Sequence, residues 1–207
     1  CGYEAGCLGY SLYNQLTAAG IKCVILAPTT MLTPQGVRIK TDMRDAYMIA
    51  QCLSYGGYHA VYIPTEDDDS VKEYLRMRND HKLALKKIKQ QINAFCIRHG
   101  FCYDGTKWTL SHLKWLKKLE ITNGLHRETL DEYMASYEEQ EAKIERYDKR
   151  IEEIAEQTKY YDKVKKLKCF LGIKTHTALS LIVETGEFER FAKGNQYASY
   201  LGLAPGE

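Results

Sequence analysis

The chain has 207 residues, of which 44% are hydrophobic, so it can bury a sizeable core and is not expected to be disordered. Its formal net charge is only +2, which excludes nucleic-acid binding through overall charge and leaves local clusters of Lys and Arg as the source of any such affinity. Seven scattered cysteines with no C-x-x-C pair argue against a zinc site or a disulfide framework and favour free thiols in a reducing compartment.

No apolar run approaches the ~20 residues that a membrane-spanning helix needs, and no signal peptide is visible. We therefore expect a cytoplasmic protein with no membrane partner. The chain begins at Cys1 without a methionine and stops in a loop at "YLGLAPGE". Both ends are predicted to be truncations of a longer protein.

The first third of the chain has the pattern of an α/β layer. Residues 4–18 follow a helical period, and "KCVILAP" (22–28) is typical of a short buried strand. A second helix is predicted within Arg38–Leu53, and "HAVYIP" (59–64) is typical of another strand. Short apolar runs that alternate with helices predict a parallel sheet.

The middle of the chain predicts two long helices. The first spans Asp69 to about His99, where apolar residues recur at spacings of three and four but Arg78 and His81 interrupt the seam. The second spans about Arg127–Tyr161 and carries apolar residues at intervals of seven positions, namely Leu130, Tyr137, Ile144 and Ile151. Two such helices most simply pair as an antiparallel coiled coil, which we expect to self-associate.

Shorter helices are predicted around this pair. The segment "WTLSHLKWLKKL" (108–119) predicts a short helix, and "CFLGIKTHTALSLIVETGEFERF" (169–191) predicts a turn and an apolar helix that stops at Gly186. A last helix begins near Asn195. The expected organisation is an α/β domain at 1–66, a helical coiled-coil region at 67–165, and the start of a small helical C-terminal domain at 166–207.

Asp42 and Asp45 open the helix in "RIKTDMRDAYMIAQCL", and two roles fit them. Asp at the N-cap with an acid at N3 would satisfy the free amides and suit the helix dipole. Residues at i and i+3 also share one helix face, so the two carboxylates could hold a hard cation if a third acid joined them. Glu4 is the candidate for that third acid, because ligands gather at the carboxyl ends of parallel strands. Taken alone, Glu4 fits an ordinary surface acid or one that complements a helix dipole better than it fits a metal ligand.

Basic residues concentrate on the first long helix. Between Lys72 and Arg98 there are eight Lys or Arg against two acids. A solvated face explains such a run as well as phosphate contact does. In "WTLSHLKWLKK" tryptophans stand beside Lys107 and Lys114, so this segment could grip unpaired bases, although Trp as core filler is an equal explanation. The second long helix is acidic and is expected to pack and dimerise.

The stretches "YEAGCLGYSLYNQLTAAGIKCVILAPTTM" and "VRIKTDMRDAYMIAQCL" closely resemble the DEDD-type insertion-sequence transposases, a family of RNA-guided (bridge-RNA) DNA recombinases. The resemblance continues through "IRHGF", "WTLSHLKWLKKL" and "LGIKTHTALSLIVETGEFERF" to "YASYLGLAP", which is essentially the whole chain. It implies a truncated RNase H-like domain with a parallel or mixed sheet, a coiled coil, and a C-terminal transposase domain.

The resemblance also implies the catalytic residues. Glu4, Asp42 and Asp45 match the second, third and fourth members of the family's acidic signature, which would bind Mg²⁺, as two ions in an intact site. The first Asp is expected upstream of Cys1, and the nucleophilic Ser is expected beyond Glu207. The chain alone is therefore expected not to catalyse, whereas the intact parent would cut and exchange DNA strands to move an insertion sequence.

Nucleic-acid contacts follow from the same resemblance. The expected partners are DNA, a structured guide RNA, and further copies of the chain in a dimer or tetramer, and the expected location is the nucleoid. A helix-hairpin-helix-like phosphate grip is expected at Gly172 and Lys174. The predicted nucleic-acid-binding residues are basic side chains at Arg38, Lys40, Arg44, Arg76, Arg78, Lys82, Lys86, Lys87, Lys89 and Lys174.

Two other functions remain open at this stage. One is a non-catalytic coiled-coil protein that binds nucleic acid. The other is a Holliday-junction-type nuclease that uses the carboxylates alone.

Overall fold

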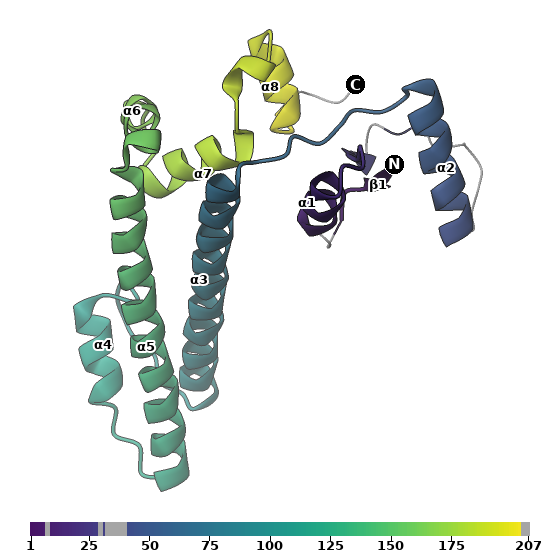
Figure 1. Ribbon diagram of the computed structural model, residues 1–207. Helices are drawn as coiled ribbons and strands as arrows, with labels where there is room; N and C mark the ends of the chain where they lie inside the picture. The colour runs from purple at the N-terminus through teal and green to yellow at the C-terminus, as the bar shows by residue number, and fades with distance from the viewer. Residues whose placement is uncertain (7–8, 29–30, 32–40, 204–207) are drawn as a thin grey trace. The chain divides into compact units, whose positions relative to one another are not determined.

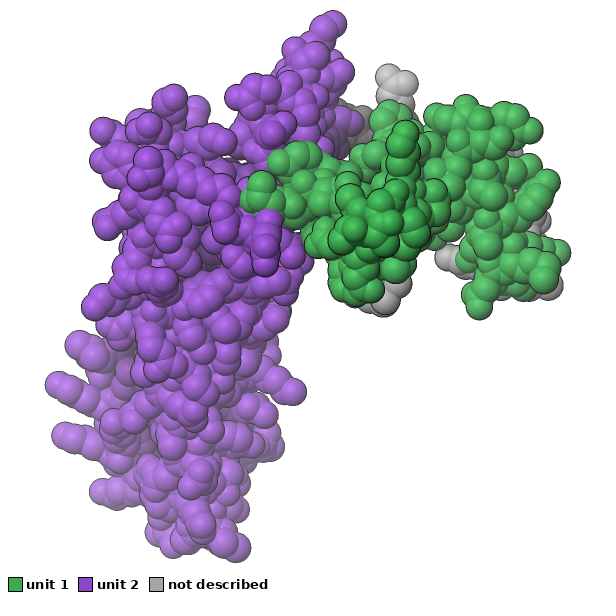
Figure 2. Space-filling view, viewed as in Figure 1, with its two compact units in different colours: residues 1–65 green, residues 66–207 purple. Residues whose placement is uncertain are grey.

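The computed structural model describes residues 1–6, 9–28, 31 and 41–203. The chain divides into two compact units, residues 1–65 and residues 66–207, which Figure 2 colours separately. The described part of the chain is mostly helical with few strands, which agrees with the predicted mixture of an α/β layer and further helices. None of the described helices is both long and apolar enough to cross a bilayer.

The first unit contains a small sheet between two helices. Strand β1 (Gly2–Glu4) pairs in parallel with β2 (Val24–Leu26), and helix α1 (Ser11–Ala18) connects them. Helix α2 (Asp42–Tyr55) packs against β1. The predicted strand 22–28 and the parallel pairing are confirmed, whereas the RNase H-like identity of the unit remains a prediction.

Two predictions for this unit are wrong in extent. The first helix begins at Ser11 and not at residue 4, because Gly2–Glu4 pair with β2 and Gly9 adopts a left-handed conformation just before the helix. The "HAVYIP" segment makes only a single antiparallel bridge, from Ala60 to Leu26, and no strand. The described sheet is thus a parallel pair with one antiparallel bridge.

The core of the first unit lies between the sheet and α2. Leu26 is fully buried, and Cys52 on α2 is buried beside it. Gly2 allows this close packing, because a Cβ atom there would lie 2.9 Å from Leu26 Cδ1 and 3.1 Å from Leu53 Cδ2. The glycine at the start of β1 therefore lets α2 approach the strand that ends at Glu4.

The second unit is built on two long helices, α3 (Glu66–Arg98) and α5 (Gly124–Ala155), that lie side by side (Figure 1). Their direction is antiparallel, since Arg78 contacts Asp148 while Phe95, farther along α3, contacts His126. The sequence predicted four apolar residues on α5 that recur every seven positions. All four are buried, namely Leu130, Tyr137, Ile144 and Ile151. The antiparallel helix pair is therefore confirmed within one chain, while its self-association stays a prediction.

The second long helix is shorter than predicted. It ends at Ala155, Gln157 adopts an extended backbone, and a new helix α6 (Thr158–Leu167) begins. The break places Tyr160 in the core, where its hydroxyl donates to Asp68 at 2.7 Å. Tyr161, the predicted last residue of the second long helix, lies in α6 and is 49% exposed.

Two apolar clusters make up the core of this unit. One joins the start of α3 and the end of α5 to α6 and α7 (Thr175–Thr185), and the other joins the remaining parts of the long helices to α4 (Leu110–Lys117). Residues predicted as separate second and third domains thus share one compact unit. Helix α7 stops at Gly186, as predicted, and the turn η2 (Phe188–Arg190) and α8 (Gly194–Tyr200) follow.

Candidate functional site

The first turn of α2 holds the two aspartates, but neither is the N-cap. Thr41 is the N-cap, and its hydroxyl accepts a hydrogen bond from the Arg44 backbone amide at 3.4 Å. The prediction of Asp42 at the N-cap is therefore wrong. Asp42 is the first helical residue, and Asp45 follows on the same face one turn later. Because Thr41 already caps the helix, the carboxylates are not required for that role.

Glu4 is the last residue of β1, and α2 packs against this strand. The structure therefore places the three predicted acids on two neighbouring elements of one unit. Among residues 1–6, 9–28, 31 and 41–203, however, no three His, Cys, Asp or Glu side chains lie close enough together to hold a metal ion. The carboxylate oxygens are suitable Mg²⁺ ligands, but this arrangement does not gather all three into a binding site.

Only some of the predicted basic residues outside α3 lie among the described residues. Arg38 and Lys40 lie outside the described residues. Arg44 is exposed in the first turn of α2. In the second unit, Lys174 is exposed at the N-cap position of α7.

Two arginines predicted to bind nucleic acid, Arg76 and Arg78 on α3, form ion pairs within the chain. Arg78 makes a two-pronged ion pair with Asp148, with its Nε 2.7 Å from Oδ1 and its Nη2 2.9 Å from Oδ2. Arg76 pairs with Glu73 at 2.8 Å and with Glu184 at 3.3 Å. The structure thus assigns these guanidinium groups a role in holding helices together.

Lys89 is held in a similar way. Its ammonium group lies 3.6 Å from Glu141 and 5.2 Å from the centre of the Trp108 ring. By contrast, Lys82, Lys86 and Lys87 are exposed and form no ion pair with the described residues. Of the predicted phosphate contacts on α3, these three lysines are the ones that remain available.

A polar layer separates the two apolar clusters. The sequence pattern indicated its residues on α3 but not their partners on α5. Arg78 and Asp148 form one part, and His81 forms the other, with its Nδ1 2.9 Å from Gln140 Oε1 and its Nε2 3.4 Å from the Tyr147 hydroxyl. The interrupted seam at Arg78 and His81 was the signal. The partners on α5 could not be found because they depend on how the two helices align.

His176 on α7 belongs to the same region. Its Nε2 is buried without a hydrogen-bond partner among the described residues. Burial lowers the pKa of His176, the positive charges of Arg78 and Lys82 lower it further, and Asp148 partly opposes them. The ring is therefore neutral at physiological pH.

The segment "WTLSHLKWLKK" is partly buried in the core, as the explanation of its tryptophans as core filler predicted. Trp108 stacks on Tyr137 with ring centres 5.4 Å apart, and its backbone amide donates to His112 Nδ1 at 3.1 Å. His112 is only 2% exposed, and Leu116 is fully buried. Trp115 is half-buried.

Comparison with known proteins gives consistent results. Residues 164–207 match the family model described as "Transposase IS116/IS110/IS902 family". The chain is 37% identical over 198 residues to the "Transposase for insertion sequence element IS1533" of Leptospira borgpetersenii, covering 94% of this chain and 57% of that protein. It is 32% identical over 206 residues to the "Putative transposase y4qE" of Sinorhizobium fredii, covering 99% of this chain and 50% of that protein. The chain thus spans about half the length of these curated relatives.

Proposed function

This chain belongs to the IS116/IS110/IS902 family of insertion-sequence transposases, and from that premise we propose that it is part of an enzyme that cuts and exchanges DNA strands to move a mobile element. The observation that carries the proposal is that relatives named as transposases align with nearly the entire chain. The proposal extends to a DNA partner, a guide RNA, and assembly of several copies.

Exposed lysines on α3 support contact with nucleic acid. Lys82, Lys86 and Lys87 offer positive charge that no described carboxylate neutralises. Each phosphate that such a lysine neutralises releases condensed counterions, which favours binding at low salt. These contacts position the strand and carry no sequence information.

We place the catalytic carboxylates in the first unit. Asp42 and Asp45 share the first turn of α2, and Glu4 ends the strand against which α2 packs. Their oxygen atoms suit Mg²⁺, which in nucleases and polymerases stabilises the attacking and leaving oxygens of a phosphodiester. Since the described arrangement does not gather three ligands, the proposal assigns the residues and no geometry.

The test replaces each aspartate with asparagine, Asp42→Asn and Asp45→Asn, in the complete transposase. Each change keeps the size of the side chain and removes its charge. We expect Mg²⁺-dependent strand cleavage to fall by about a hundredfold or more, because even outer-shell partners of a metal ligand contribute 10–100-fold. Cleavage of labelled DNA is measured across a series of Mg²⁺ concentrations.

The matched control is Asp69→Asn, which removes an aspartate from the first turn of α3 in the other unit. It should leave cleavage unchanged. Full cleavage by both α2 variants would contradict the metal assignment and favour a purely nucleic-acid-binding role. Cleavage without strand joining by the unaltered protein would indicate the junction nuclease instead.

A further inference from the structure

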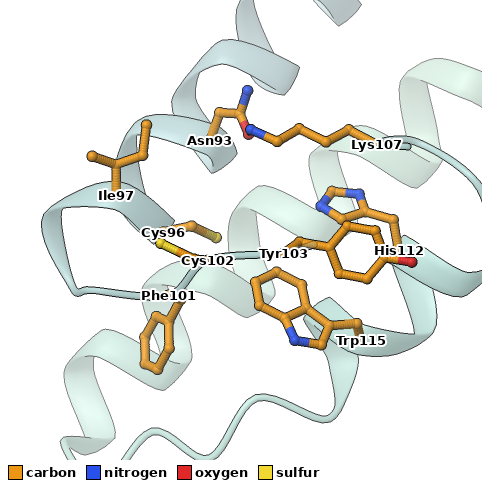
Figure 3. A pocket seen from close by; sticks show the side chains of 9 residues that line it. All are labelled: Asn93, Cys96, Ile97, Phe101, Cys102, Tyr103, Lys107, His112 and Trp115. Carbon is orange, nitrogen blue, oxygen red and sulfur yellow. The ribbon is translucent and has the colours of Figure 1, made fainter. Parts of the chain in front are cut away.

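A cavity of about 130 Å³ opens between the end of α3 and the segment that leads into α4 (Figure 3). The rings of Tyr103 and Trp115 form part of its wall, with their centres 5.1 Å apart. Asn93 and Lys107 also line it, and so does the exposed Cys102. No step of the proposed function uses this cavity.

The size of the cavity selects among planar ligands. An engineered protein cavity of ~150 Å³ takes one benzene molecule. The present cavity, at about 130 Å³, is therefore matched to a single six-membered ring. A pyrimidine base has one such ring and fits within the cavity, whereas a purine has two fused rings, and its second ring would extend out of the open mouth.

The polar groups of the cavity suit the edge of a base. Lys107 Nζ donates to Asn93 Oδ1 at 2.8 Å, and the Asn93 amide retains two N–H donors. His112, which also lines the cavity, accepts the Trp108 amide at Nδ1, so its neutral ring carries the proton on Nε2. Aromatic walls with adjustable donors and acceptors are the usual means of holding an unpaired base.

The segments that form the cavity are rich in basic residues, of which Lys89 and Lys117 are paired with acids on α5. Residues 81–119 contain nine Lys or Arg and one acid, Asp104. Lys82, Lys86 and Asn93 follow one another at spacings of four and seven residues, so they share one face of α3. The exposed lysines therefore lie on the face of α3 that continues to Asn93, which lines the cavity.

We propose that this cavity binds one unpaired pyrimidine base of a single-stranded nucleic acid whose phosphates contact the lysines of α3. The inference rests on the proposed nucleic-acid-binding function and adds a base-binding site to it. The site reads the size of the base, while the lysines contribute affinity without sequence preference.

The test measures how fast iodoacetamide alkylates Cys102 in the 207-residue chain when an oligonucleotide is bound. The probes are oligo-dT, oligo-U, oligo-dA and an abasic strand, each of about twelve nucleotides, within the site sizes of single-strand-binding modules. Saturating oligo-dT or oligo-U should slow the alkylation of Cys102 by about fivefold or more, while the abasic strand should not. Exposed Cys1, in the other unit, is the internal control and should react at one rate throughout.

Two variants test the rim of the cavity without disturbing the core. Asn93→Ala and Lys107→Met should reduce the preference for oligo-dT over the abasic strand by about fivefold, the typical net contribution of one hydrogen bond. Lys149→Met removes an exposed lysine from α5 and should leave that preference unchanged. Stronger protection by oligo-U or by oligo-dT would support the site and identify RNA or DNA as the strand.

Other outcomes would overturn the proposal. Equal protection of Cys102 by oligo-dA would contradict the size argument. If all four strands bind but Cys102 reacts at its unliganded rate, the base site is wrong and the nucleic-acid-binding function stands. If no strand binds at low salt, both fail.

Discussion

At the scale of single residues, the polar layer between α3 and α5 determines how the second unit is assembled. A two-pronged Arg–carboxylate pair is both directional and stronger than a neutral hydrogen bond. Arg78 is 13% exposed and Asp148 is 45% exposed, so the pair is only partly withdrawn from water. Its contribution lies mainly in alignment, because shifting α5 by one turn would leave a largely buried guanidinium without its partner.

His176 makes this layer sensitive to pH. The folded state lowers the pKa of His176 below its ordinary value of 6.5, so the unfolded chain binds more protons below that pH. We therefore expect the free energy of unfolding of the second unit to be highest above about pH 7 and to fall as the pH drops below about 6.5. Urea unfolding, followed by tryptophan fluorescence at one pH above about 7 and at one pH below about 6.5, measures this fall.

The variant His176→Gln provides the comparison, because it removes the titrating group and keeps a polar side chain. It should reduce the fall in stability between the two pH values. Some dependence should remain, because burial also lowers the pKa of His112. An unchanged pH dependence in the variant would show that His176 is not responsible.

At the scale of elements, the helices end where side chains or backbone conformation supply the missing hydrogen bonds. Thr41, Thr109 and Asn123 each accept an amide from the first turn of α2, α4 and α5 respectively. Gly56 closes α2 in the left-handed conformation. These local features explain why most helix ends lie close to the predicted positions.

The cap at Thr41 separates helix stability from the role of the aspartates. We expect Thr41→Ala to cost about 1 kcal/mol, which should speed hydrogen exchange of the α2 amides by about fivefold while α3 is unaffected. Hydrogen-exchange mass spectrometry of residues 42–55 measures this change, and Thr41→Ser should restore protection. Unchanged exchange in Thr41→Ala would show that the carboxylates themselves stabilise the helix end.

At the scale of the whole molecule, the chain has two cores with no shared buried cluster among the described residues. Both tryptophans, Trp108 and Trp115, lie in the second unit. Tryptophan fluorescence therefore reports the unfolding of that unit alone. This distribution makes the independence of the two units measurable.

We expect Leu130→Ala to lower the tryptophan-detected stability by about 2–5 kcal/mol, and Leu26→Ala to leave it unchanged. Both leucines are fully buried, Leu130 in the second unit and Leu26 in the first. Urea unfolding of the two variants is the measurement. A similar loss in both would mean that the units unfold as one.

Local patterns predicted much of the candidate site and of the helix pair. The i and i+3 spacing placed Asp42 and Asp45 on one face of α2, and the seven-residue apolar repeat on α5 predicted four buried residues. The same patterns could not show that Arg78 is bound to Asp148, or that Asn93 and Trp115 line one cavity. Those contacts join positions far apart in the chain.

The amino-acid sequence by itself showed a resemblance to insertion-sequence transposases through its motifs. It also determined the two long helices and the types of charge each carries, because helical periodicity and composition are properties of neighbouring residues. Only the tertiary structure decided which lysines on α3 remain exposed, which arginines are consumed in ion pairs, and where a cavity forms. The physical reason is that an ion pair or a cavity depends on the relative alignment of packed helices, which is set by the whole core at once.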